Sequence, residues 1–397
     1  MKALALLVLP LAACSSSAIS VTSDFEGGSL GKVQQVSATH FRCAVAGQAD
    51  QDGRNRQASW YSFRLDGAKG REVTITLTEL RGEYNYKPAG LCVRDDTPPL
   101  VSADGKTWRH LESISLEKDE ATFRLTAESD AVWIAHLEPY PTSRLERFLD
   151  EIRGAPHLKD EVIGKSVEGR DLHLLTITEF AAESAAPPPT VWLMCRQHAW
   201  ESGTSFVGEG AIRFLLSEDA APLRRSLVFK ILPMMDPDGC ARGGVRFNRH
   251  GYDLNRNWDT ADPENPEHRR LMPEICAAKK VIHAFSGFFL TLHNQETGEW
   301  LSSSEKNRPI AERFFAALKE QTTFNPNEKG PRAPSAKPTP GRASVYEYLD
   351  GQRGMSAFLL EQGITRSSKL GHLPTSQDRL EFGRQLIRVM ADVAMGK

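Results

Sequence analysis

The sequence lacks an excess of charge of either sign, because its 49 lysines and arginines are balanced by 51 aspartates and glutamates. It has no basic tail and no glycine-rich phosphate loop, and together these absences argue against a nucleic-acid partner. It also lacks any apolar run that approaches the roughly 20 residues of a bilayer-spanning helix. What remains is the composition of an ordinary globular protein, 40% hydrophobic over 397 residues, and that length favours two or three domains.

Cysteine is also scarce, with six residues in the chain. Apart from Cys14, near the N-terminus, they are Cys43, Cys92, Cys195, Cys240 and Cys276. Because five is an odd number, at least one of these thiols is free or pairs outside the chain. Cys43 and Cys92 are the natural candidates for a disulfide, since both lie in a strand-rich region, although the sequence does not decide the pairing. Cys195 is predicted to be a small apolar residue of the core.

The beginning of the chain has the features of a secretory signal. Lys2 supplies the charged start, and residues 3–9 form an apolar run that is too short to span a bilayer. Leu11-Ala12-Ala13-Cys14 then resembles a bacterial lipoprotein cleavage box.

That resemblance implies a signal peptide over residues 1–13, lipid attachment at Cys14 and a tether over residues 14–24. Such an anchor holds a folded domain at the membrane without a spanning helix. Ser15 in place of aspartate favours, by analogy, the periplasmic face of the outer membrane in a bacterial cell envelope. The alternative is an ordinary secretory signal with an incidental cysteine.

Residues 25–138 have the pattern of a small antiparallel β-sandwich. Short alternating runs at residues 73–77, 122–125 and 132–135 are typical of strands with one buried face, and residues 103–106 are typical of a turn. The segment contains no evident catalytic cluster. Its predicted role is to support folding, and the alternative is that it shapes the entrance to a neighbouring site.

Residues 142–397 have an alternating pattern of strands and helices, which predicts an α/β domain. Pro139 and Pro141 mark the boundary, and Ser143-Arg144-Leu145-Glu146 resembles a capping box that opens a helix. The expected strands are residues 172–177, 191–195, 227–233, 288–292 and 355–360, and the expected helices are 203–216, 266–285, 309–319 and 377–395.

Polar residues with metal-ligand chemistry follow three of these strands. His198-Ala199-Trp200-Glu201 comes after the second strand, His293 after the fourth and Glu361 after the fifth. Side chains at the carboxyl ends of strands converge in open α/β sheets, and catalytic zinc takes three ligands from histidine, glutamate and cysteine. His-x-x-Glu alone is a weak signal, since it also occurs in solvated surface pairs.

The complete set of motifs resembles that of zinc metallocarboxypeptidases of the pancreatic type, and most closely their cytosolic-carboxypeptidase branch and its bacterial relatives. Asp236-Pro237-Asp238-Gly239 stands where that branch carries Asn-Pro-Asp-Gly, and Asp253-Leu254-Asn255-Arg256-Asn257-Trp258 follows it. Trp60-Tyr61-Ser62-Phe63-Arg64, further upstream, resembles the small β domain that precedes the peptidase in this branch. The resemblance implies a mixed eight-stranded sheet flanked by helices.

The resemblance also implies a role for each matching residue. His198, Glu201 and His293 would hold one Zn²⁺ per chain, and Glu361 would be the general base. Arg246 would stabilise the oxyanion, although Arg249 lies close enough in sequence to serve instead. Asn255 and Arg256 would bind the substrate carboxylate, and Asp253 would fix the tautomer of His198.

These roles describe an enzyme that hydrolyses the C-terminal peptide bond of peptides or proteins. One alternative is a murein-peptide amidase or an N-acyl amino acid deacylase that uses the same site, and another is a non-catalytic peptide-binding envelope protein. Ser344-Val345 favours an apolar terminal side chain, whereas the cations Lys306, Arg308, Arg342 and Arg353 favour an acidic one. Residues 325–342, rich in proline and glycine, have the pattern of a lid over the site.

Overall fold

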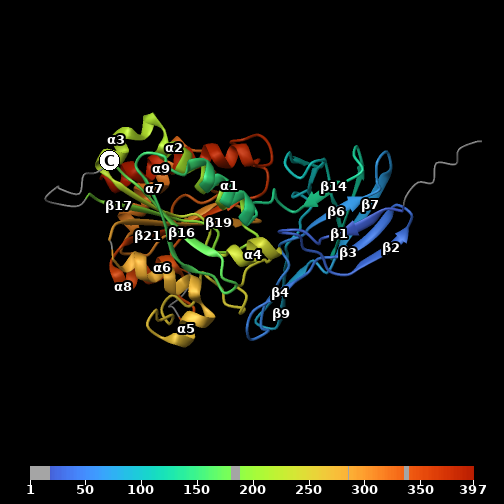
Figure 1. Ribbon diagram of the computed structural model, residues 1–397, viewed down its shortest axis with the longest axis horizontal. Helices are drawn as coiled ribbons and strands as arrows, with labels where there is room; N and C mark the ends of the chain where they lie inside the picture. The colour runs from blue at the N-terminus through green and yellow to red at the C-terminus, as the bar shows by residue number, and fades with distance from the viewer. Residues whose placement is uncertain (1–17, 180–187, 285, 335–338) are drawn as a thin grey trace, which may run out of the picture.

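The computed structural model describes residues 18–179, 188–284, 286–334 and 339–397. Two bodies lie side by side along the long axis of the molecule, one built from strands alone and one from strands and helices (Figure 1). The predicted signal peptide and Cys14 lie outside the described residues. The predicted tether overlaps them, and there Ser20–Thr22 form strand β1, which pairs with a later strand.

The first body is made of fourteen short strands. They are β1 Ser20–Thr22, β2 Val33–Ser37, β3 His40–Ala44, β4 Gln48–Ala49, β5 Arg56–Gln57, β6 Ser62–Asp66, β7 Glu72–Thr78, β8 Arg81–Tyr84, β9 Lys87–Leu91, β10 Leu100–Ser102, β11 Arg109–His110, β12 Ser115–Glu117, β13 Glu120–Thr126 and β14 Val132–Ala135. Two five-stranded sheets run β1-β6-β14-β10-β11 and β12-β13-β7-β3-β2, and a four-stranded sheet runs β4-β5-β8-β9.

Both five-stranded sheets contribute to one buried core, which contains Phe63, Ile75 and Phe123. In β13 alternate residues are buried in this core, as the period of a half-buried strand requires. The predicted sandwich is therefore present, but it is not wholly antiparallel, because β3 and β7 pair in parallel. Cys43 and Cys92 are both buried free thiols, so the candidate disulfide is wrong.

The second body contains a seven-stranded sheet in the order β15-β16-β18-β17-β19-β21-β20. Its strands are β15 Leu158–Lys165, β16 Asp171–Ile177, β17 Thr190–Met194, β18 Val228–Leu232, β19 Phe288–Gln295, β20 Trp300–Ser302 and β21 Ser356–Gly363. The four central strands are parallel and the edges are antiparallel. In β17, Val191 and Leu193 face one core while Trp192 and Met194 face another, so both faces are covered.

The prediction of eight strands in this sheet is wrong for the described residues. Beyond the edge strand β20, Ser302 forms only an isolated bridge with Arg332. Pro331 and Pro334 lie on either side of that bridge, and proline has no N–H to extend a ladder. The position next to β20 therefore holds a single bridge in place of a strand.

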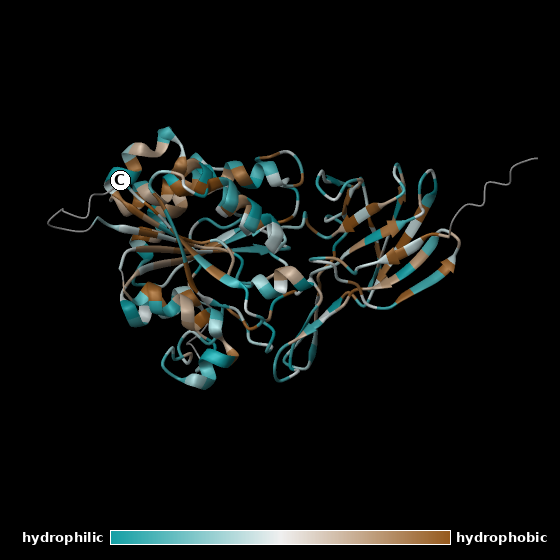
Figure 2. Cartoon of the chain, in the orientation of Figure 1, coloured by the Kyte–Doolittle hydropathy of each residue, from teal (hydrophilic) through white to brown (hydrophobic). Residues whose placement is uncertain are grey.

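Helices cover the two faces of this sheet (Figure 1). They are α1 Thr142–Ile152, α2 Ser202–Leu216, α3 Ala221–Ser226, α4 Pro237–Arg242, α5 Pro266–Leu271, α6 Pro273–His283, α7 Arg308–Gln321, α8 Val345–Arg353 and α9 Ser376–Ala394, with a 3-10 turn at Glu218–Ala220. Helices α1, α2, α7 and α9 pack on one face and α6 and α8 on the other. Figure 2 shows largely hydrophobic strands between helices along which hydrophobic and hydrophilic residues alternate.

Two helix predictions differ from the structure. The single helix expected at residues 266–285 is two helices that meet at Met272, because Pro273 has no N–H for the preceding turn. The predicted capping box at Ser143 is absent, since the helix starts one residue earlier and the carboxylate of Glu26 accepts the N–H of Ser143 at 3.0 Å. In the described parts of the chain, no helix is long and apolar enough to cross a membrane.

Candidate metal centre and active site

The loop that follows β17 carries the first two predicted metal ligands. Its shape is held by Arg196, a buried residue with a left-handed backbone (φ 58°). The Arg196 guanidinium donates to Ala199 O at 2.9 Å from Nε and to Ser205 Oγ at 3.0 Å from Nη1. A residue in this sparsely populated region persists only where its surroundings enforce it, and such residues cluster at functional sites. The turn brings His198 and Glu201 together just before α2 begins.

Strands β19 and β21 carry the other two predicted residues. His293 and Glu361 are register partners in this parallel pair, so both side chains emerge on the same face of the sheet. Neither is beyond the end of its strand, since β19 continues to Gln295 and β21 to Gly363. The register therefore brings the proposed base beside the third proposed ligand.

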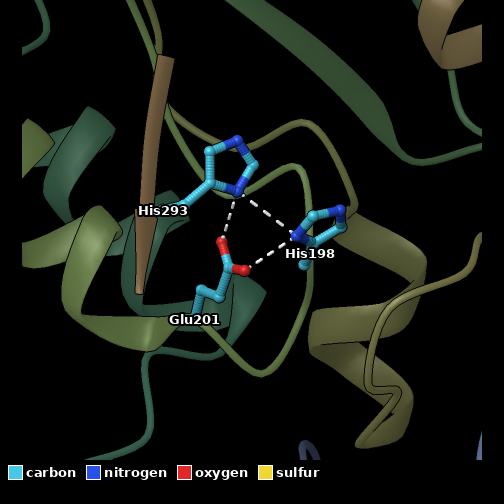
Figure 3. A group of neighbouring side chains, drawn as sticks. All are labelled: His198, Glu201 and His293. Atoms are coloured by element: carbon cyan, nitrogen blue, oxygen red, sulfur yellow. Dashed lines mark hydrogen bonds and ion pairs between the residues drawn. The ribbon is translucent and has the colours of Figure 1, made fainter. Parts of the chain in front are cut away.

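His198, Glu201 and His293 form a compact cluster (Figure 3). Nδ1 of His198 lies 2.7 Å from Oε1 of Glu201, and Nδ1 of His293 lies 2.9 Å from Oε2 of the same carboxylate. The two Nδ1 atoms are 3.3 Å apart. One ligand atom from each residue lies within 4.8 Å of the others, and all three residues are buried. Two imidazoles and one carboxylate are a ligand set that catalytic zinc uses.

The remaining ring nitrogens of both histidines have polar partners. Nε2 of His198 lies 3.1 Å from Oδ1 of Asp253, and Nε2 of His293 lies 3.3 Å from Oγ1 of Thr291. The Thr291 hydroxyl donates to Gln197 Oε1 at 2.7 Å, so its oxygen is free to accept from His293. For His198, a carboxylate partner of this kind holds the proton on Nε2 and leaves Nδ1 as the metal-binding atom. Nε2 of His293 also lies 3.2 Å from the amide nitrogen of Asn255, so this ring has two polar neighbours at Nε2.

Electrostatics in the cluster suit a metal ion. Burial lowers the pKa of His293, whereas Glu201 and Asp253 raise the pKa of His198 against the effect of burial. Although burial opposes ionisation of Glu201, the histidines beside it lower its pKa to about 2. A neutral imidazole and an ionised carboxylate are the forms that bind metal, so metal binding would release the proton that these carboxylates favour on His198. The donor set therefore fits zinc in identity.

Glu361 is the least satisfied polar group of the site. Within the described residues its Oε2 is buried and has no hydrogen-bond partner. Burial, together with the charge of Glu201, raises the pKa of Glu361 well above its usual value, and Arg246 opposes that shift. A carboxyl group with a raised pKa and a free oxygen is suited to accept and return a proton.

The structure distinguishes between the two candidate arginines. Arg246 Nε donates to Asp253 Oδ2 at 2.8 Å, and the Arg246 side chain is 24% exposed. Arg249 instead pairs with Glu168 at 2.7 Å and is 47% exposed. Burial opposes ionisation of Asp253, yet Arg246 and His198 hold its pKa well below the usual value. Arg246, His198 and Asp253 are therefore one linked group, to which Arg249 does not belong.

The two predicted carboxylate binders lie at different depths. Asn255 is buried, with Nδ2 3.2 Å from Nε2 of His293, and its Oδ1 accepts the N–H of Val345 at 3.1 Å. Arg256 donates from Nη1 to the Asn255 carbonyl at 2.7 Å and lines an open cleft. Burial lowers the pKa of Arg256, although Asp253 opposes that shift.

The cleft has a volume of about 390 Å³ and lies between the two bodies. From the second body it is lined by Arg246, Phe247, Asp253, Arg256, Asn257, Pro340, Gly341 and Arg342, and from the first by Asp50, Gln51, Arg54, Asn55, Gln57 and Tyr84. The cleft residues of the first body were not predicted from the sequence, because no motif marks residues that reach the site only through folding.

Of the four cations considered for specificity, only Arg342 lines this cleft, where its Nη2 donates to Tyr84 Oη at 3.2 Å. Arg308 pairs with Glu312, and Arg353 donates to the His283 carbonyl. Val345, considered for an apolar pocket, is fully buried. Part of the predicted lid, residues 335–338, lies outside the described residues.

Comparison with known families agrees with this arrangement. Residues 145–299 match the family described as zinc carboxypeptidase, and residues 21–137 match the cytosolic carboxypeptidase N-terminal domain. Human cytosolic carboxypeptidase 6 is 30% identical over 275 residues, which cover 65% of this chain and 52% of that protein. The mouse protein is 29% identical over 275 residues, covering 65% and 48%. The chain thus spans about half the length of these relatives.

Solved structures share the whole fold. A metallo-carboxypeptidase from Burkholderia cenocepacia superimposes with a TM-score of 0.81 at 22% identity, covering 96% of this chain and all of that one. A metallo-carboxypeptidase from Pseudomonas aeruginosa has a TM-score of 0.80 at 21% identity, with coverage of 94% and 98%. These likenesses establish the two-body fold. The two family matches identify residues 145–299 as a zinc carboxypeptidase domain, preceded by a cytosolic carboxypeptidase N-terminal domain at residues 21–137.

Proposed function

We propose that this protein is a zinc-dependent carboxypeptidase that hydrolyses the C-terminal peptide bond of peptides or proteins. The observation that carries the proposal is the register of β19 with β21, which brings the unpaired carboxyl of Glu361 beside a His-Glu-His cluster. Asp253, which contacts His198, lines the neighbouring cleft together with Arg246 and Arg256. A base beside a metal site, with cationic side chains nearby, supplies the parts that peptide hydrolysis needs.

In this proposal His198, Glu201 and His293 hold one Zn²⁺ ion. The bound ion would supply Lewis acidity, lowering the pKa of water and polarising the scissile carbonyl. Asp253 keeps the His198 imidazole in the tautomer that exposes Nδ1. The three side chains converge from a loop and a strand.

Glu361 takes a proton from the attacking water and returns it to the leaving amine. Arg246 donates a hydrogen bond to the carbonyl oxygen as negative charge develops there, a contribution that is often the largest in acyl transfer. Arg256, with Asn255 behind it, binds the carboxylate of the terminal residue through charge-assisted hydrogen bonds. The terminal side chain then occupies the cleft beside Arg342 and Tyr84.

The test is mass spectrometry of a peptide panel with varied C-terminal residues, treated with the zinc-loaded protein and with Glu361→Gln in parallel. Loss of a single C-terminal residue in the wild-type reaction alone supports the proposal and reveals the preferred residue. If no peptide is cleaved while zinc is bound, the carboxypeptidase assignment is wrong. Cleavage of murein fragments alone then indicates the amidase, and binding without cleavage indicates a peptide-binding protein.

We also propose that the mature protein is anchored to the bacterial envelope through a lipid on Cys14. The support is the Leu11-Ala12-Ala13-Cys14 box after a short apolar run. Expression of the full chain in a Gram-negative host, followed by mass measurement of the N-terminal peptide, tests it. A diacylglyceryl mass on Cys14, lost in Cys14→Ala, is the expected result, and cleavage at another position refutes the anchor.

A further inference from the structure

We propose that Gln48, a residue of the N-terminal body, positions Arg246 for the reaction. This inference rests on the proposed function, in which Arg246 stabilises the oxyanion. It assigns to the first body a direct part in the chemistry, beyond support of folding. Gln48 does not touch the substrate in this proposal; it acts through the backbone that carries Arg246.

Four hydrogen bonds join the Gln48 amide to three consecutive residues of the peptidase domain. Its Oε1 accepts from the N–H groups of Val245 at 2.9 Å, Arg246 at 2.6 Å and Phe247 at 3.0 Å. Its Nε2 donates to the Phe247 carbonyl at 2.6 Å. One side chain thus holds the backbone on both sides of the Arg246 Cα.

Three consecutive N–H groups that converge on one point form a concavity that attracts a negatively polarised atom. In the described part of the chain these three groups donate to Gln48 and to no other acceptor. Without the Gln48 oxygen, the segment would therefore have three unpaired donors.

A second contact holds the other end of the same segment. The N–H of Gln51 donates to the Gly251 carbonyl at 3.1 Å. Gly251 has φ 83°, and a Cβ built there would lie 2.4 Å from the Gln51 nitrogen, so only glycine permits this approach. Arg246 lies within the first of these contacts, and its ion-pair partner Asp253 lies two residues beyond the second. The loop that carries both partners is thus attached to the first body at two points.

The experiment is a double-mutant cycle with Gln48→Ala and Arg246→Ala, measured as kcat and KM on the best peptide of the panel. Gln48→Ala should lower kcat by about 10- to 100-fold with little change in KM, because a displacement near 1 Å costs about that much. In the Arg246→Ala background it should lower kcat by less than about twofold, since the group that it positions is gone. A purely structural role would reduce both backgrounds equally.

Two further variants separate positioning from folding. Gln35→Ala, on the exposed edge strand β2 of the same body, is the matched control and should leave kcat unchanged. Gln48→Glu keeps the acceptor oxygen and should retain several-fold more kcat than Gln48→Ala. Zinc content and the melting transition are measured for every variant. Should Gln48→Ala fail to fold, Gln48→Glu takes its place in the cycle and must show the same non-additivity.

Three results would overturn the inference. They are a kcat of Gln48→Ala within twofold of the wild type, an equal loss in both backgrounds, and a loss that appears only in KM. If the wild-type protein cleaves no peptide at all, the proposed function fails and the positioning role falls with it. If the wild type is active but the double-mutant cycle is additive, only the positioning role of Gln48 is refuted.

Discussion

Two groups of buried carboxylates lie in the peptidase domain, and the chain satisfies them differently. Asp238 accepts from Ser166 Oγ at 2.7 Å, from the N–H of Glu168 at 2.8 Å and from Arg170 at 2.7 Å. Glu201, by contrast, meets only the ring nitrogens of two histidines, and one oxygen of Glu361 meets no donor among the described residues.

This difference separates a structural carboxylate from a functional one. A buried charge is costly unless donors surround it, and the chain supplies three donors to Asp238. At the His198-Glu201-His293 cluster the side chains that face Glu201 are themselves proposed metal ligands, and Glu361 keeps a raised pKa. In the proposed function, metal and substrate binding would offset the free energy lost by burying these groups, a pattern common at active sites.

The largest expected effect belongs to Glu361→Gln. Removal of the proposed base should lower kcat by about 10³-fold or more, within the range seen for general acid–base groups. Stability should stay the same or rise, because a buried carboxyl without a partner becomes a neutral amide. Steady-state kinetics of the metal-loaded variant check the loss of kcat, and its thermal unfolding checks the stability. A variant that keeps activity, or that melts well below the wild type, would contradict the functional assignment of this carboxylate.

Metal removal should have the next largest effect. A ligand that binds only the folded state at 1,000 times its dissociation constant adds about 4 kcal/mol of stability. Dialysis against a chelator should thus lower the melting temperature by several degrees and abolish peptide hydrolysis, and zinc should restore both. Glu201→Gln is the control, because it should melt at the same temperature with and without zinc. A melting temperature insensitive to zinc in the wild type would exclude a metal at this cluster.

Much of this site was predictable because its proposed residues lie in or just after apolar strands of one sheet. His198 follows β17, while His293 and Glu361 are register partners within the adjacent parallel strands β19 and β21. The order of the motifs along the chain thus carries the geometry of the cluster. The identity of Asp253 as the partner of His198 follows from the same motifs.

The rest depends on contacts between distant segments. Gln48 meets Val245 across 197 positions, and Glu26 replaces the predicted capping box of Ser143 across 117. Neither pairing has a local signature, because a glutamine in a short strand and a glutamate in a loop are compatible with many environments. The parallel pairing of β3 with β7 is equally non-local. Local periodicity therefore predicted the elements, and the motifs predicted the His198-Glu201-His293 cluster, but neither predicted the contacts between the two bodies.

A change at the structural carboxylate should affect stability rather than activity. Asp238→Ala leaves Arg170, Ser166 and a backbone N–H without their acceptor, and loss of one partner of a buried ion pair costs about 3 kcal/mol. Urea unfolding should show that loss, with kcat within about threefold of the wild type. Asp150→Ala, which removes an exposed pair with Arg153, should change stability by less than about 0.5 kcal/mol. A large loss of kcat in Asp238→Ala at normal zinc content would contradict the assignment of Asp238 as a structural carboxylate.

Asp236 combines features of the structural carboxylate Asp238 and of the proposed functional carboxylate Glu361. It therefore tests the comparison between them. One of its oxygens accepts the N–H of Gly239 at 2.9 Å, while the other is buried without a partner among the described residues, as in Glu361. Asp236 is nevertheless absent from the metal cluster, and burial raises its pKa to about 8. The unpartnered oxygen is thus accommodated by a proton rather than by a ligand.

The sign of the pH effect follows from that proton. The folded state keeps it up to about pH 8, whereas the unfolded chain releases it near pH 4, so the free energy of unfolding falls as pH rises between these values. Asp236→Asn removes this slope. We expect it to match the wild type near pH 4 and to be more stable by about 2–5 kcal/mol at pH 8, since a tenfold difference in proton affinity between the folded and unfolded chains corresponds to about 1.4 kcal/mol. Urea unfolding at the two pH values measures the difference. If the wild type and Asp236→Asn show the same dependence of unfolding free energy on pH, Asp236 is ionised in the folded protein. An unpartnered buried oxygen in this domain is then not by itself a sign of a protonated structural group.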